Sequence, residues 1–211
     1  MGKPRSAEVS PIRKVNPIAI ITLFVFAAAI STLSQDPTSD IHAAKWDFSI
    51  WIAGETGEEI TNSFTEAQIW SAGVSAGRML TDDLGHGWRR GKLEYAFDVM
   101  PVFETYGNQR THGFGFDPVI LRWNSALRKN GISPYVELSG GAVVTPVNLP
   151  PGNTSSFNFM AKGGGGIDCH TRARQALDIG VHWSHISNAN LGVENYEFNG
   201  VQVNIAYHWY K

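Results

Sequence analysis

The stretch Lys92–Phe103, KLEYAFDVMPVF, alternates between apolar and polar side chains. A β-strand sends successive side chains to opposite faces, so a period of two separates two faces. One face is apolar and holds Leu93, Tyr95, Phe97, Val99, Pro101 and Phe103. The other face carries Glu94 and Asp98, and the stretch therefore predicts a strand between an apolar and a polar environment.

The same alternation recurs along the chain, broken each time by turn residues. It predicts eight strands, at about 46–56, 68–80, 91–104, 113–125, 133–146, 155–170, 174–188 and 197–210. Most exceed the roughly 9–11 residues that a tilted strand needs to span a bilayer. A soluble β-sandwich would also show many alternating strands, and it remains the alternative.

Two further features favour a membrane barrel over a sandwich. The polar faces carry charged residues, which suit a lumen with ion pairs and water: Glu94, Asp98, Arg122, Glu137, Lys162 and Asp178. Aromatic residues recur near strand ends, as an interfacial girdle requires: Trp46, Tyr95, Trp123, Tyr135, Trp183, Trp209 and Tyr210. We therefore predict an all-β fold, an eight-stranded antiparallel transmembrane β-barrel.

The N-terminal segment resembles a secretory signal peptide. Arg13 and Lys14 precede the apolar run VNPIAIITLFVFAAAISTLSQ, and no charge follows until Asp36. A basic region, an apolar core and small residues near the end are typical of such a peptide. We expect a signal peptide at residues 1–34, with a retained helix as the alternative, and a barrel domain at 35–211. With both barrel termini in the periplasm, the expected outer loops are 57–67, 105–112, 147–154 and 189–196, and the inner turns are 81–90, 126–132 and 171–173.

Composition excludes several classes of function. The net charge is −2, so the basic surplus of a nucleic-acid-binding protein is missing. Cys169 is the single cysteine, which rules out an internal disulfide and a cysteine metal cluster. His182 and His185 fall on opposite faces of one strand and are not expected to share a metal ion. The Gly163–Gly166 run is expected to kink a strand or to make room for inward side chains. We expect no metal and no organic cofactor.

The stretch Gln175–Asn188, QALDIGVHWSHISN, carries the candidate chemistry. Its alternation places His185 and Ser187 on the lipid-facing side, near the outer end of the strand. Residues i and i+2 lie about 6.6 Å apart along a strand, so an imidazole can reach the hydroxyl and act as its base. Glu197 and Asn199 share this face on the following strand. The plainer interpretation is that these polar groups lie in the headgroup zone and have no role.

The segments HISNANLG, LEYAFDVMPVF, GFGFDPVILRWN and PYVELSGG resemble the PagL family of outer-membrane lipid A 3-O-deacylases. The resemblance covers about residues 68–207. It implies an eight-stranded barrel in which His185 is the base and Ser187 the nucleophile that cleaves the 3-O-linked hydroxyacyl ester of lipid A. It also implies that Asn188 helps to hold the oxyanion.

The third catalytic residue departs from the family, whose members place a glutamate in the following strand. Gapless spacing from Ser187 leads to Asn199, which is our first candidate. Glu197 is the second candidate, and Glu194 is the third because it fits only with a shortened loop. An asparagine orients imidazole by accepting a hydrogen bond but adds no charge, so we expect a slower enzyme.

The sequence therefore predicts a serine esterase of the cell outer membrane that acts on lipid A within lipopolysaccharide. A non-catalytic small barrel, structural or adhesive, is the alternative, and an acyltransferase is a third hypothesis. The acyl-chain preference stays open, and so does the question whether the chain forms a homodimer.

Overall fold

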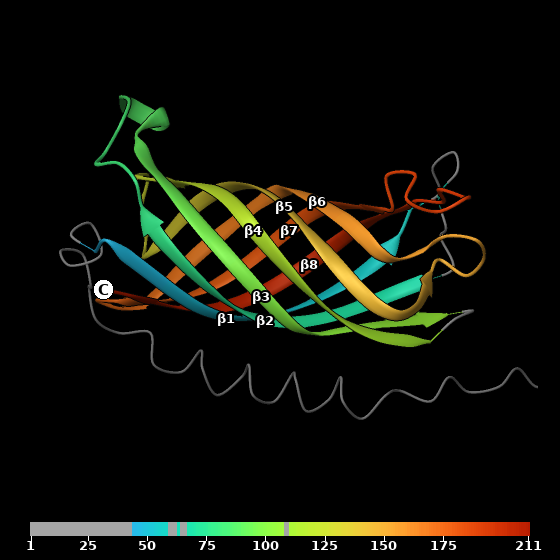
Figure 1. Ribbon diagram of the computed structural model, residues 1–211. Helices are drawn as coiled ribbons and strands as arrows, with labels where there is room; N and C mark the ends of the chain where they lie inside the picture. The colour runs from blue at the N-terminus through green and yellow to red at the C-terminus, as the bar shows by residue number, and fades with distance from the viewer. Residues whose placement is uncertain (1–43, 59–62, 64–66, 108–109) are drawn as a thin grey trace, which may run out of the picture. The chain divides into compact units, whose positions relative to one another are not determined.

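The structure is a computed structural model that describes residues 44–58, 63, 67–107 and 110–211. Within these residues there are eight strands: β1 Trp46–Gly57, β2 Ala67–Met79, β3 Gly91–Gly107, β4 Thr111–Ser125, β5 Ile132–Leu149, β6 Ser155–Arg172, β7 Gln175–Ser187 and β8 Phe198–Tyr210. Each strand pairs antiparallel with the next, and β8 pairs with β1, which closes the barrel (Figure 1). The predicted fold is confirmed. The expected signal peptide at 1–34 lies outside the described residues.

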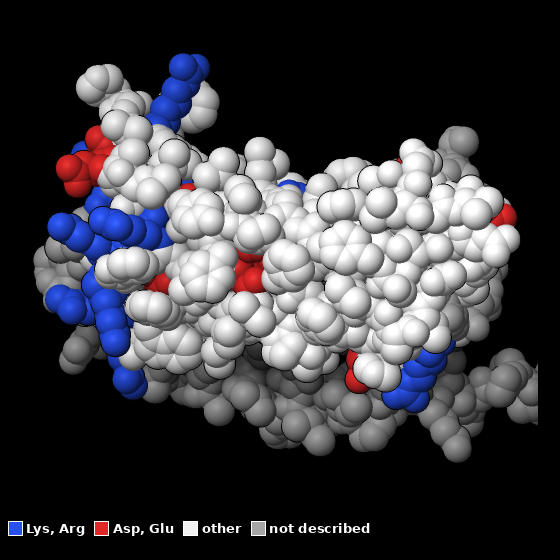
Figure 2. All heavy atoms as spheres, in the orientation of Figure 1, with Lys and Arg blue, Asp and Glu red and all other residues white. Residues whose placement is uncertain are grey.

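The outer wall of the barrel is apolar. Large side chains such as Ile50, Phe97 and Val136 are 52%, 47% and 59% exposed. In Figure 2 the middle of the visible face carries few charged atoms, whereas Lys and Arg gather at the end where β1 begins. Soluble monomers rarely expose apolar surface on this scale, so lipid covers this wall. No helix in the described part of the chain is long and apolar enough to cross a bilayer.

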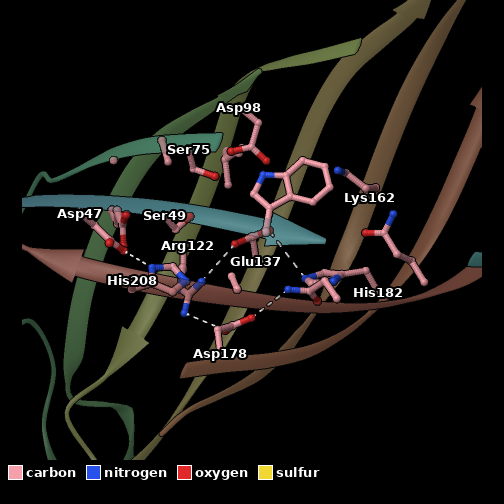
Figure 3. Close-up of a pocket in the computed structure, with 18 residues that line it drawn as sticks. Asp47, Ser49, Ser75, Asp98, Arg122, Glu137, Lys162, Asp178, His182 and His208 are labelled. Atoms are coloured by element: carbon pink, nitrogen blue, oxygen red, sulfur yellow. Dashed lines mark hydrogen bonds and ion pairs between the residues drawn. The ribbon is translucent and has the colours of Figure 1, made fainter. Parts of the chain in front are cut away.

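The lumen holds the charged side chains. Arg122 Nη2 lies 2.8 Å from Asp168 Oδ1 and 3.2 Å from Asp178 Oδ2, and Lys162 Nζ lies 2.7 Å from Asp117 Oδ2. Buried charges require such partners because desolvation is costly. The six charged residues predicted to face the lumen all line one internal cavity of about 60 Å³ (Figure 3). The alternation therefore assigned these side chains to the correct face.

The glycine run on β6 makes room for inward side chains, as one of the two expectations had it. A Cβ on Gly164 would lie 2.8 Å from the imidazole of His182, and one on Gly166 would lie 2.8 Å from the hydroxyl of Tyr135. Both would also collide with the backbone of β7, at Val181 O and Ile179 O. The prediction that Tyr135 and Tyr210 belong to the aromatic girdle is wrong, because each is only 4% exposed. Tyr135 faces inward because it lies two residues before the lumen-facing Glu137 on β5. From there its hydroxyl donates to Asp178 Oδ1 at 3.2 Å.

A β-bulge changes the faces of β3 near its end. Pairing with β4 shifts between Met100 and Phe103, and both Pro101 and Val102 are exposed. Two successive outward residues reverse the alternation beyond them. Phe103 therefore lies inside the barrel at 1% exposure, and its predicted place on the apolar face is wrong.

The two ends of the barrel differ in their connections. The end where β1 begins and β8 ends, here called the turn end, carries the turns 80–90, 126–131 and 173–174. The opposite loop end carries the connections 58–66, 108–110, 150–154 and 188–197. The first turn is long because it contains a 3-10 helix, η3 Gly87–Arg89, and it projects beyond the other turns (Figure 1). The turn end also carries both termini of the barrel, so we assign it to the periplasm and the loop end to the outer side, although the longest connection, 80–90, lies at the turn end.

Candidate active site

The candidate residues occupy the last positions of β7, at the loop end of the barrel. Burial alternates along this strand, and Asp178, His182 and Ser184 face the lumen at 0%, 4% and 0% exposure. His185 and Ser187 fall on the other register and lie half-buried on the outer wall. The structure therefore places both side chains on the lipid-facing surface, close to the loop end of the barrel.

Three side chains form a continuous hydrogen-bonded row on this surface. His185 Nε2 lies 3.0 Å from Ser187 Oγ, and His185 Nδ1 lies 2.8 Å from Asn199 Oδ1. An amide oxygen only accepts, so the bond to Asn199 places the imidazole proton on Nδ1. Nε2 is then unprotonated and accepts from the serine hydroxyl, which is the tautomer that a general base requires.

The sheet register brings Asn199 to the imidazole. Asn199 on β8 lies directly opposite His185 in the antiparallel ladder, and directly opposed side chains are close neighbours. The β1–β2 connection also reaches this asparagine: Asn199 N donates to Ser63 Oγ at 3.3 Å, and Glu58 N donates to Asn199 O at 2.7 Å. Asn199 is only 4% exposed as a result. Burial strengthens its bond to the imidazole, because water cannot compete for the oxygen.

The two glutamates considered for the third position lie elsewhere. Glu194 is held by the β5–β6 loop: its carboxylate accepts from Asn153 N at 3.1 Å, and its own N donates to Asn153 O at 3.0 Å. Glu197 forms an isolated bridge with Ser63. Among the described residues, Asn199 supplies the bond to His185 Nδ1 and neither carboxylate does.

Asn188 organises the loop that follows the serine. Its Nδ2 donates to Glu194 O at 2.8 Å, its N donates to Asn195 Oδ1 at 3.2 Å, and its Oδ1 accepts from Asn190 N at 2.9 Å. The side chain is fully buried. These bonds hold a tight turn in which Ala189 and Asn190 both have positive φ. For the expected role at the oxyanion, Asn188 would have to use the second hydrogen of Nδ2, because Glu194 takes the first.

The lumen cavity is the other concentration of polar groups, and several of its charged side chains pair with one another (Figure 3). Asp168, Asp178 and His208 bring potential ligand atoms within 4.8 Å of one another. However, Arg122 bonds both oxygens of Asp168 and one of Asp178, whose other oxygen accepts from Tyr135 and Asn204. These carboxylates therefore already have a cation and donors, and the group does not fit a metal ion.

Three residues that contribute to the outer-wall site were not predicted from the sequence. Ser63 and Asn195 come from connections whose course no periodicity predicts, and they contact Asn199 and Asn188 respectively. Trp183 was assigned only to the aromatic girdle, but its ring stacks on that of His185. A spacing of two on one strand is the signal that could have identified this last contact.

The chain was compared with protein-family models, curated sequences and solved structures. The family model described as lipid A 3-O-deacylase (PagL) matches residues 61–208. The crystal structure of the outer-membrane enzyme PagL superposes with a TM-score of 0.58 at 18% identity, covering 75% of this chain and 97% of that one. The N-terminal barrel of Pseudomonas aeruginosa OprF gives 0.46 at 15% identity, covering 77% and 97%. OprG from the same organism gives 0.47 at 14%, covering 82% and 99%. No curated protein sequence matches.

Proposed function

The chain belongs to the PagL family of lipid A 3-O-deacylases, and we propose that Ser187, His185 and Asn199 are the residues with which it cleaves its substrate. As a member of this family, the protein is an ester hydrolase of the outer membrane that deacylates lipid A. The observation that supports the site is the hydrogen-bonded row from Ser187 Oγ through the imidazole to Asn199 Oδ1, at 3.0 and 2.8 Å.

The proposed reaction begins with the serine. As Oγ attacks the carbonyl carbon of the 3-O-linked acyl ester, His185 Nε2 takes its proton. The tetrahedral intermediate then collapses, and the imidazolium returns the proton to the departing sugar oxygen. This leaves the acyl group esterified to Ser187. A water molecule, deprotonated by His185, attacks the acyl-enzyme and releases a 3-hydroxy fatty acid and the free serine.

The position of the site explains how substrate reaches it. Lipid A forms the outer leaflet, and Ser187 faces outward at the outer end of β7. An acyl ester therefore meets the nucleophile without leaving the membrane. The lumen offers no comparable route, because the cavities among its described residues, of about 60, 60 and 10 Å³, suit a few water molecules at most.

Asn199 defines what kind of catalyst this is. Its oxygen fixes the correct tautomer, but it provides no charge to stabilise the imidazolium that forms during attack. We propose that the protein is consequently a slower enzyme than one with a carboxylate at this place. The proposed oxyanion donor is Asn188, whose fully buried side chain would have to turn toward Ser187 to offer its second amide hydrogen.

Mass spectrometry of lipid A tests the proposal. The full chain is expressed in an outer membrane whose lipid A carries a 3-O-hydroxyacyl group, beside Ser187→Ala, His185→Ala and the control Ser184→Ala. Ser184 lies on the same strand but faces the lumen. We expect one hydroxyacyl mass to be lost with the wild type and the control, and retained with the other two variants.

Other outcomes would favour the competing functions. Unchanged lipid A in the presence of a correctly folded wild-type barrel contradicts the proposal and leaves a barrel without this chemistry. A gain of acyl mass on another acceptor identifies a transferase.

A further inference from the structure

Trp183 lies on the same outer face of β7 as the proposed catalytic residues. Its ring centroid is 5.8 Å from that of His185, and the two planes differ by 17°. In the ladder Trp183 is paired with Gly163 on β6, which has no side chain, and with Val201 on β8. The indole is 47% exposed. It therefore lies nearly parallel to the imidazole and borders the lipid.

The proposed reaction creates a positive charge beside this indole. His185 becomes an imidazolium when it takes the proton of Ser187, and a cation at a lipid-facing site is poorly solvated. Asn199 contributes only the dipole of its amide. The face of an aromatic ring carries partial negative charge, and tryptophan is the strongest of the cation–π partners within about 6 Å.

We propose that Trp183 is a positioning residue of this esterase, whose indole face stabilises the imidazolium form of His185 where the chain has no carboxylate to do so. The inference rests on the proposed roles of His185 and Ser187. It assigns to a lipid-facing tryptophan an electrostatic contribution to the rate, in addition to contact with acyl chains.

Stacking alone would not establish this role. Trp46 and Phe48, also two residues apart on one strand, stack at 6.4 Å and 16°, although neither ring can carry a charge. A spacing of two therefore brings rings together anywhere on the wall. The decisive test must separate the effect of the indole on a charged imidazole from its effects on packing and on lipid contact.

A double-mutant cycle with Asn199 makes that separation. Trp183→Leu is measured alone and combined with Asn199→Asp, with the purified full-length barrel acting on lipid A in mixed micelles. Trp183→Phe retains an aromatic face. Trp70→Leu is the matched control, because Trp70 is a lipid-facing tryptophan on β2 that is 54% exposed. Values of kcat and KM are determined for each folded variant.

We expect Trp183→Leu to lower kcat by about 3- to 30-fold, the range that a cation–π contact gives. Trp183→Phe should recover most of this loss, and Trp70→Leu should leave kcat unchanged. In the Asn199→Asp background the loss should shrink to about two-fold or less. A carboxylate and an imidazolium form a neutral pair, and a neutral pair interacts weakly with the ring.

Three results would overturn the inference: an equal loss of kcat in both backgrounds, a change confined to KM, or an equal loss with Trp70→Leu. Each would reduce Trp183 to a contact for lipid or substrate. A Ser187→Ala barrel measured in parallel distinguishes this failure from that of the proposed function. If that variant stays active, the assignment of the nucleophile is wrong and this inference is wrong with it.

Discussion

Within the described part of the chain, two serine–histidine pairs are hydrogen-bonded, and they lie on opposite faces of the barrel wall. Ser187 Oγ and His185 Nε2 lie 3.0 Å apart on the outer wall, while Ser133 Oγ and His170 Nε2 lie 2.6 Å apart in the lumen. Both lumen residues are 8% exposed and border a cavity of about 60 Å³ near the turn end. The first pair faces acyl chains, and the second faces a space for a few water molecules.

We infer from this comparison that a close hydroxyl and imidazole are not sufficient for the proposed esterase chemistry. By distance alone the lumen pair is the closer one, yet no acyl ester fits beside it. What distinguishes the outer pair is access to lipid and the bond from Asn199 that sets the imidazole tautomer. A shift of one position along a strand moves a side chain to the other face of the wall. That face decides whether a serine–histidine pair meets lipid or is enclosed in the lumen.

Removal of each serine hydroxyl in turn tests whether only the outer pair is catalytic. Ser187→Ala should reduce kcat by about 10⁴-fold or more, as expected for loss of a nucleophile that works as a unit with its base. Ser133→Ala should leave kcat unchanged, because its pair meets no substrate. Rates of release of 3-hydroxy fatty acid from lipid A, per folded barrel, give both values. Comparable losses in the two variants would place the chemistry in the lumen and refute the outer site.

A second prediction concerns the lumen, whose ion pairs contribute to stability and not to catalysis. Replacing Arg122 by Met leaves Asp168 and Asp178 buried without their cation, so the free energy of unfolding should fall by about 3–5 kcal/mol. Urea titration of barrels in lipid vesicles measures this change. Arg78→Met is the control: Arg78 is an exposed residue that lies over Trp46, and its loss should cost about 0.5 kcal/mol or less.

Activity provides the other half of this test. The Arg122→Met barrels that remain folded should retain the wild-type kcat, because the guanidinium serves the lumen and not the outer wall. A large fall in kcat at full folding would show that the lumen network supports the site, and the two regions would then not be independent.

The smallest expected effect concerns Asn199, the hydrogen-bond partner of His185 at the outer site. Asn199→Asp keeps the shape of the side chain and adds a charge, so kcat should rise by about five-fold, since bonds to charged groups are about 1 kcal/mol stronger. Asn199→Leu removes the oxygen and should lower kcat by about ten-fold or more through loss of the tautomer. A gain of activity with Leu would contradict a role for Asn199. Kinetics on lipid A at one pH, with Ser133→Ala as reference, measure these changes.

The fold could be predicted almost entirely from local pattern. Which face a side chain occupies depends on whether its position in an extended strand is odd or even, and this placed His185 and Ser187 outside and Arg122 inside before any contact was known. One error occurred where a β-bulge interrupts the alternation, and the other where the aromatic girdle was assigned without regard to it. The bulge at Pro101 and Val102 moved Phe103 inward. Tyr135 lies on the lumen face together with Glu137, as the alternation of β5 requires, so only its assignment to the aromatic girdle was wrong.

The sequence by itself determined that the chain forms a barrel and that an imidazole and a hydroxyl share its outer wall, because alternation is a property of each strand alone. Only the tertiary structure decided which group orients the imidazole. Glu194, Glu197 and Asn199 were all compatible with the sequence, and the choice depends on the register between β7 and β8 and on the loop that joins them. That register sets Asn199 opposite His185, and the loop carries Glu194 away to Asn153. Such placements arise between strands, and no single strand encodes them.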